Sequence, residues 1–291
     1  GGYPGGHVGT GEVHRWMLYC FDFESGKMLW EFEAHQGIPP QMRHPRSSFA
    51  NETPVTDGER VYAYFANIGL FCCDMNGHKL WERRWPSYPM RDGWNTGSSP
   101  VLHGGRVFIQ NDNDEASFLE TVDKLTGKTL WRVPREERST WSTPYVWENG
   151  QRTELVTIGM NKVRSYAVED GALLWEISGT AGLVSQIPLS KHGLLYAGAG
   201  YHYGPLYAIK PGAKGDISLQ GEATSNEFIA WSQKRGSSIH PGYLISGERL
   251  FVCYDSGLLG CFHAKTGEEI IPMTRLNTKG GRFYASPWAY N

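Results

Sequence analysis

The chain has 291 residues, and its 28 Lys and Arg against 30 Asp and Glu give a formal net charge of −2. This balance, without a basic run, argues against nucleic-acid binding, which depends on clustered Lys and Arg. No apolar stretch approaches the roughly 20 residues needed to cross a bilayer, so no membrane-spanning segment is expected. The 36 glycines and 16 prolines favour many short strands and tight turns over long helices.

In chain order, the sequence predicts a series of similar units of short strands. Residues 12–34 contain only the outer two strands of a unit, and a connection rich in Pro and Arg follows at 35–49. Four strands are expected in each complete unit, and the fifth of the units carries a polar insertion at 216–227. The last residues open another unit and stop. The expected units are 12–34 (partial), 50–85, 98–134, 141–178, 184–232, 241–274 and 283–291 (partial).

One hairpin sequence recurs through these units. TVDKLTGKTLW (121–131) has imperfect copies that end at Trp30, Trp81 and Trp175, and a weaker copy at 261–271 has lost both the Asp and the Trp. Trp30, Trp81, Trp131, Trp175 and Trp231 follow one another at intervals of 44 to 56 residues. A period near 40–50 residues with four antiparallel strands is typical of a β-propeller. We therefore predict an all-β chain of four-stranded blades.

The repeated tryptophan and glycine have a structural explanation. A small twisted sheet cannot bury both of its faces alone, so neighbouring sheets are expected to stack face to face. An indole can bury up to roughly 250 Å² in such a stack. A glycine in the turn allows a flat ring to lie close to the backbone. The glycines in this position are Gly26, Gly77, Gly127 and Gly171.

The pattern Ala/Cys–x–Asp–x–x–x–Gly–Lys–x–x–Trp resembles the tryptophan-docking repeat of the pyrroloquinoline-quinone (PQQ)-like propellers. That family includes quinoprotein alcohol dehydrogenases, and GSSPVL, PLYAIKPGAKGDISL and YASPWAYN resemble most the BamB-like outer-membrane assembly and PQQ-repeat proteins of bacteria. The resemblance implies one propeller domain over 1–291, a periplasmic or exported location, and about seven visible blades of about eight. Residues 16–34 and 284–291 would then share a composite blade; the alternative is an open ring with exposed edges.

The resemblance does not carry a quinone site onto this chain. Quinoprotein dehydrogenases have a disulfide between adjacent cysteines, but Cys72 and Cys73 lie inside a predicted strand, where successive side chains point to opposite faces. Asn51, Glu52, Asn95 and the run Asn111–Asp114 offer oxygen ligands for a hard cation, but we expect the run to be a solvated loop. We therefore predict no cofactor, neither PQQ nor calcium, and no metal site. The remaining cysteines, Cys20, Cys253 and Cys261, are expected to be small apolar strand residues.

Without a recognisable catalytic motif, the predicted site is geometric. The residues that open the inner strands should ring one mouth of the axial channel, where converging polar groups form a default binding site. The alternative is a water-filled channel that binds no ligand and whose polar wall groups already have hydrogen-bond partners. The predicted residues are Arg46, Asn51, Ser98, Ser99, Ser142, Gln186, His240 and Ser286.

Three functions remain open. The first is a non-catalytic scaffold for protein partners, with Trp85, Tyr88 and Trp94 as exposed anchors. The second is a PQQ-dependent alcohol or sugar dehydrogenase, and the third is a carbohydrate-binding propeller. Fold analogy alone does not choose among them.

Overall fold

The computed structural model describes residues 11–180, 182–198, 200, 203–276 and 283–290. Strands form nearly all of its regular structure, and within these ranges the one helical element is a 3₁₀ turn, η1 (Arg91–Gly93). The described residues contain no helix of the length and apolarity that a membrane span requires. The chain divides into two compact units, the first ending at Ser139 and the second beginning at Thr140.

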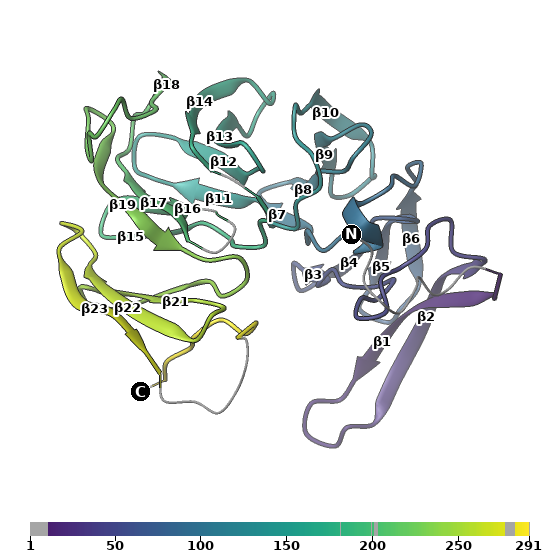
Figure 1. Ribbon diagram of the computed structural model, residues 1–291. Helices are drawn as coiled ribbons and strands as arrows, with labels where there is room; N and C mark the ends of the chain where they lie inside the picture. The colour runs from purple at the N-terminus through teal and green to yellow at the C-terminus, as the bar shows by residue number, and fades with distance from the viewer. Residues whose placement is uncertain (1–10, 181, 199, 201–202, 277–282, 291) are drawn as a thin grey trace. The chain divides into compact units, whose positions relative to one another are not determined.

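The first unit contains three antiparallel sheets whose strands follow one another in chain order (Figure 1). In its described part the first sheet has two strands, and each of the other two sheets has four. The strands are β1 (His14–Phe21) and β2 (Met28–Gly37); β3 (Val55–Thr56), β4 (Arg60–Phe65), β5 (Gly69–Asp74) and β6 (Lys79–Arg83); and β7 (Val101–His103), β8 (Arg106–Asn111), β9 (Phe118–Asp123) and β10 (Thr129–Pro134).

The second unit repeats this arrangement with three further sheets. Its first sheet gains a fifth strand, β18, which pairs in parallel with β14. The strands are β11 (Tyr145–Glu148), β12 (Thr153–Ile158), β13 (Lys162–Ala167), β14 (Leu173–Ser178) and β18 (Gly215–Asp216); β15 (Leu189–Lys191), β16 (Leu194–Gly198), β17 (Gly204–Ile209) and β19 (Ile229–Ser237); and β20 (Tyr243–Ser246), β21 (Arg249–Cys253), β22 (Leu258–His263) and β23 (Glu269–Arg275). The predicted four-stranded antiparallel repeats are confirmed.

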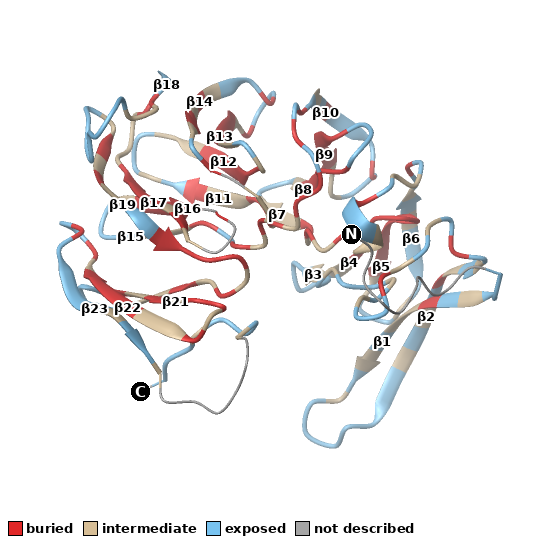
Figure 2. Ribbon diagram, in the orientation of Figure 1, coloured by how far each residue is buried: buried red, intermediate tan, exposed pale blue. Residues whose placement is uncertain are grey.

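The middle strands of the β3–β6 sheet are apolar on both faces because this sheet packs against the sheet of β1 and β2 on one side and that of β7–β10 on the other. In β4, Tyr62 and Tyr64 join a buried cluster with residues of β8 and β9, whereas Ala63 and Phe65 join a second cluster with Trp16 of β1. Successive side chains of a strand point to opposite faces, so one strand supplies both clusters. Figure 2 shows the same concentration of buried residues in β5, β9 and β12.

Three of the repeated indoles lie on the turn of the next sheet. The Nε1 atom of Trp30 donates to Met75 O at 2.8 Å, that of Trp81 to Lys124 O at 3.1 Å and that of Trp231 to Ala264 O at 2.8 Å. The glycine of each receiving turn lies directly beneath the ring. A Cβ atom would come within 2.8 Å of the indole at Gly77, 2.6 Å at Gly127 and 2.5 Å at Gly267.

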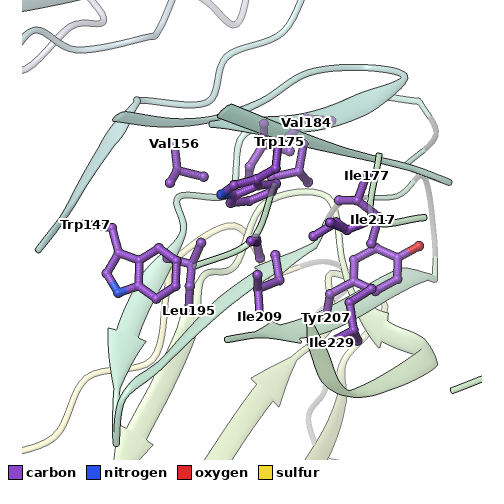
Figure 3. Packing of buried hydrophobic residues seen from close by; sticks show 14 residues of the cluster. Trp147, Val156, Trp175, Ile177, Val184, Leu195, Tyr207, Ile209, Ile217 and Ile229 are labelled. Carbon is purple, nitrogen blue, oxygen red and sulfur yellow. The ribbon is translucent and has the colours of Figure 1, made fainter. Parts of the chain in front are cut away.

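Trp175 is bound differently from these three. Its Nε1 donates to the Glu154 carboxylate at 2.6 Å within its own sheet. The insertion at 216–227 enters the core only at its start, where β18 pairs with β14 beside Trp175 and Ile217 is buried in the same cluster; residues 220–227 are exposed. Figure 3 shows Trp175, Ile177 and Ile217 among the side chains of this core.

Two expectations about polar and aromatic loop residues are wrong. Trp85 is not an exposed anchor: it is buried, donates to Glu120 Oε2 at 2.7 Å and stacks on Phe118. The run that begins at Asn111 is not solvated either, since its first three residues are buried. Asp112 accepts from Arg135 Nε at 2.7 Å, and neither side chain of this pair is exposed. A buried charge of this kind requires a paired partner, and the partner lies 23 residues further on.

Candidate functional site

The predicted channel-mouth residues of the second unit come together around Gln186. Ser142, which precedes β11, donates its hydroxyl to Gln186 O at 2.6 Å. The side-chain Nε2 of Gln186 donates to Pro241 O at 2.6 Å, just before β20. One buried glutamine therefore ties together the segments that open three successive sheets.

The other end of the Gln186 amide is also fully engaged. Its Oε1 accepts hydrogen bonds from Ser237 Oγ at 2.6 Å and from the Tyr243 hydroxyl at 2.8 Å. Burial raises the pKa of Tyr243 far above its usual range, so this hydroxyl keeps its proton and remains a donor. The network fixes the positions of the loops that carry the neighbouring side chains.

His240 and Ser286 lie beside this network. The Nδ1 atom of His240 is 3.2 Å from Ser185 Oγ, and its ring is 4.9 Å from the ring of Tyr284. Ser185 also lies 2.8 Å from Ile239 O, an acceptor without a proton, so its hydroxyl donates there and not to the imidazole. Ser286 Oγ accepts from Gly242 N at 2.9 Å.

These residues line a pocket of about 250 Å³, which we call the Gln186 pocket. Exposed apolar side chains lie next to it in the chain: Ile187 belongs to the lining, and Tyr284 and Trp288 flank Ser286. Trp288 is 76% exposed and stacks with Tyr290, which is 83% exposed, at a ring distance of 5.3 Å. The lining residues are Ser185, Gln186, Ile187, Pro188, Leu189, His240, Gly242, Tyr243 and Ser286.

The predicted residues of the first unit form a separate loop network. Asn51 Nδ2 donates to Thr96 O at 2.8 Å, and Thr53 N donates to Ser99 Oγ at 2.9 Å. These bonds join the segment before β3 to the segment before β7. Arg46 enters through its backbone, whose N donates to His44 Nδ1 at 3.1 Å. Ser98 is buried, and its hydroxyl has no hydrogen-bond partner within the described ranges.

Glu52 is the most perturbed acid of this network. Its carboxylate accepts from Thr96 Oγ1 and, at 3.4 Å, from Ala66 N. Burial raises the pKa of Glu52 above its usual range, although these hydrogen bonds act in the opposite direction. The parts of the chain with assigned positions contain no group of three or more His, Cys, Asp or Glu placed to hold a metal ion.

Cys72 and Cys73 are both buried free thiols, each at a ladder position of β5. Cys72 belongs to the cluster of Tyr62 and Val107, and Cys73 Sγ contacts Val61 O at 3.9 Å. Burial raises the pKa of Cys72 to about 12 and that of Cys73 to about 11. Both groups are therefore neutral near pH 7 and unreactive.

Sequence reasoning identified Ser142, Gln186, His240 and Ser286 but missed Ser185, Tyr243 and the exposed Trp288. Ser185 and Tyr243 are immediate chain neighbours of the segments already selected, so their positions alone were a usable signal. The exposure of Trp288 has no such signal, because a tryptophan in this repeat is usually buried. Whether all eight predicted residues surround a single mouth stays a prediction.

No protein-family model matches the sequence, and no curated protein sequence matches it. Solved structures do match. BamB from Moraxella catarrhalis is 14% identical with a TM-score of 0.60, and the match covers 84% of this chain and 67% of that chain. The computationally designed Ika8 protein is 13% identical with a TM-score of 0.61 over 92% of this chain and 70% of that chain. Both are propellers, and the chain described here has the β-propeller fold.

Proposed function

We propose that this protein is a non-catalytic, PQQ-like and BamB-like β-propeller that binds protein partners in a bacterial cell envelope. Residues 1–291 would belong to one propeller domain, and the periplasm or cell exterior would be its location. The tryptophan-docking repeats and the similarity to the BamB fold support the family assignment. No cofactor or metal is part of the proposal.

The observation that carries the proposal is the Gln186 pocket with its exposed aromatic neighbours. Tyr284, Trp288 and Tyr290 present large rigid apolar surfaces, the residue types that dominate binding energy at protein interfaces. Polar groups beside them, on Ser185, His240 and Ser286, provide directional hydrogen bonding at the same place. An apolar centre with a polar margin is the usual anatomy of a protein-binding patch.

Site-specific photo-crosslinking in cells tests the proposal. A photoreactive phenylalanine analogue replaces Trp288 in the full chain, and the matched control carries it at Leu173 on β14, which is also exposed in the second unit. We expect a discrete protein adduct from position 288 and none from position 173. The adduct should weaken when His240 is replaced by alanine.

Two results would contradict this function. Identical adduct patterns from the two positions would indicate random collision, and the absence of any adduct at position 288 would remove the proposed surface. Fractionation of the same cells tests the location separately, since the proposal places the chain outside the cytoplasm.

A further inference from the structure

The three docked indoles share one detail of their receiving turns. Each N–H donates to the carbonyl of the residue that follows the last strand residue: Met75 after Asp74, Lys124 after Asp123 and Ala264 after His263. Two to three residues later comes the glycine on which the ring lies. A carbonyl acceptor and a bare backbone patch therefore define an indole-binding turn in this protein.

The first sheet contains a fourth turn of the same construction. Asp22 N donates to Lys27 O at 2.8 Å and Gly26 N to Asp22 O at 2.9 Å, as Asp123 N does to Lys128 O at 2.8 Å and Gly127 N to Asp123 O at 2.9 Å. The φ angle is +67° at Gly26 and +69° at Gly127. Asp22 therefore corresponds to Asp123, Phe23 to Lys124 and Gly26 to Gly127. Phe23 O would accept the indole N–H, and the ring would lie on Gly26.

This turn holds no indole within the described residues. A Cβ atom built on Gly26 meets nothing within 4 Å, whereas at Gly127 it would come within 2.6 Å of Trp81. The side chain of Phe23 is completely exposed. Within the described first unit the turn is thus preformed and open.

The sheet face beside the turn carries exposed apolar side chains next to the turn, whereas Glu31 and the ion-paired Arg15 and Glu33 lie further along it. One face of β1 and β2 packs Trp16, Leu18 and Phe32 into the core of the first unit. The other face presents Tyr19, Phe21 and Leu29, which are 48%, 56% and 62% exposed. Figure 2 shows the corresponding pale stretches of β2. In the four sheets that contain β4, β8, β12 and β16 both faces of the middle strands are buried, so the exposed apolar side chains here indicate a missing neighbour.

We propose that the Phe23–Gly26 turn and the outer face of β1 and β2 bind a tryptophan-bearing β-strand of a partner polypeptide. The indole lies on Gly26, and its N–H donates to Phe23 O. This binding site lies in the first unit and does not involve the Gln186 pocket.

A second copy of this chain is a poorer occupant than such a partner. Trp30, Trp81 and Trp231 already donate to carbonyls of their own units, and Trp175 donates to Glu154. Trp131 is buried, and the exposed Trp288 lies outside the assigned strands, so it does not present its indole from a hairpin strand. The strand β23 offers Ile271 at the position that pairs like these tryptophans, because Ile271 lies opposite Cys261 as Trp30 lies opposite Cys20. Isoleucine has no N–H, so it would leave Phe23 O without its hydrogen bond.

The test uses a cyclised peptide that copies residues 118–134, with 5-fluorotryptophan at the position of Trp131. Cyclisation is needed because an isolated two-stranded hairpin is marginally stable in water. Fluorine NMR of the peptide should show saturable binding to the full chain. Exchanging its fluorotryptophan for isoleucine should weaken binding at least about 10-fold.

Protein variants locate the binding site. Gly26→Ala should weaken binding at least about 10-fold, because its Cβ atom occupies the place of the ring. Gly58→Ala is the matched control, since its φ is +88° and its Cβ atom meets nothing within 4 Å; it should leave binding unchanged. Phe21→Glu on the outer face should also weaken peptide binding, and this substitution introduces no backbone strain.

Four results would overturn the proposal: no saturable binding at millimolar peptide, equal effects of the two glycine variants, equal binding of the isoleucine peptide, or binding that appears only in Ile271→Asp. The last result would mean that β23, of the same or another copy, already covers this face. Sedimentation at several protein concentrations shows whether the covering β23 belongs to the same copy or to another, because only the second case depends on concentration.

Discussion

The substitution Gly127→Ala tests the docking of an indole on a glycine turn. At φ +69° an alanine costs about 1–2 kcal/mol relative to glycine. Its Cβ atom would lie 2.6 Å from Trp81 Cε3, and ordinary contact begins at 3.4 Å, so the ring must move by about 0.8 Å. That movement weakens the 3.1 Å bond from Trp81 Nε1 to Lys124 O, which is worth about 1 kcal/mol. We expect a total loss of about 2–3 kcal/mol.

Urea unfolding monitored by tryptophan fluorescence measures this loss. Gly58→Ala carries the backbone strain without a ring contact, so it should lose only about 1–2 kcal/mol. In a Trp81→Ala background the cost of Gly127→Ala should fall to the same value, which a double-mutant cycle detects. A coupling energy near zero between positions 81 and 127 would refute the docking argument.

Three further predictions concern ionisable and hydrogen-bonding side chains. Burial raises the pKa of Asp57, but hydrogen bonds from Lys124 Nζ at 2.9 Å and from backbone amides bring it well below its usual range. Lys124→Met should therefore lower the free energy of unfolding by about 1 kcal/mol near pH 7. The variant should also lose less stability than the wild type as the pH falls below about 4; the same pH dependence for both proteins in urea unfolding would contradict this. Cys72 and Cys73, with pKa values of about 12 and about 11, should resist alkylation at pH 8 until the protein unfolds, and mass spectrometry showing modification of either in the native state would speak against it. Trp175→Phe leaves the buried Glu154 without its indole donor and should destabilise the protein by about 2–3 kcal/mol, whereas Trp30→Phe, whose acceptor is accessible to water, should lose less than about 1 kcal/mol; equal losses in thermal unfolding would exclude this explanation.

The sequence by itself determined the sheets and their docking turns. A hairpin such as residues 121–131 contains its strand residues, its turn glycine and its tryptophan within one short segment, so local chemistry specifies the structure. Apolar residues at successive positions of β4 likewise predict a sheet covered on both faces. Such features require no knowledge of distant contacts.

Tertiary structure decided where the polar groups and several aromatic rings lie. Trp85 is buried because Glu120, 35 residues away, accepts its N–H, and Asp112 is buried because Arg135 pairs with it. The Gln186 pocket depends on contacts with residues 44 to 57 positions distant along the chain. The period of the repeat predicts that such segments become neighbours, but side-chain direction and burial depend on the packing of three sheet openings at once. No local pattern contains that information.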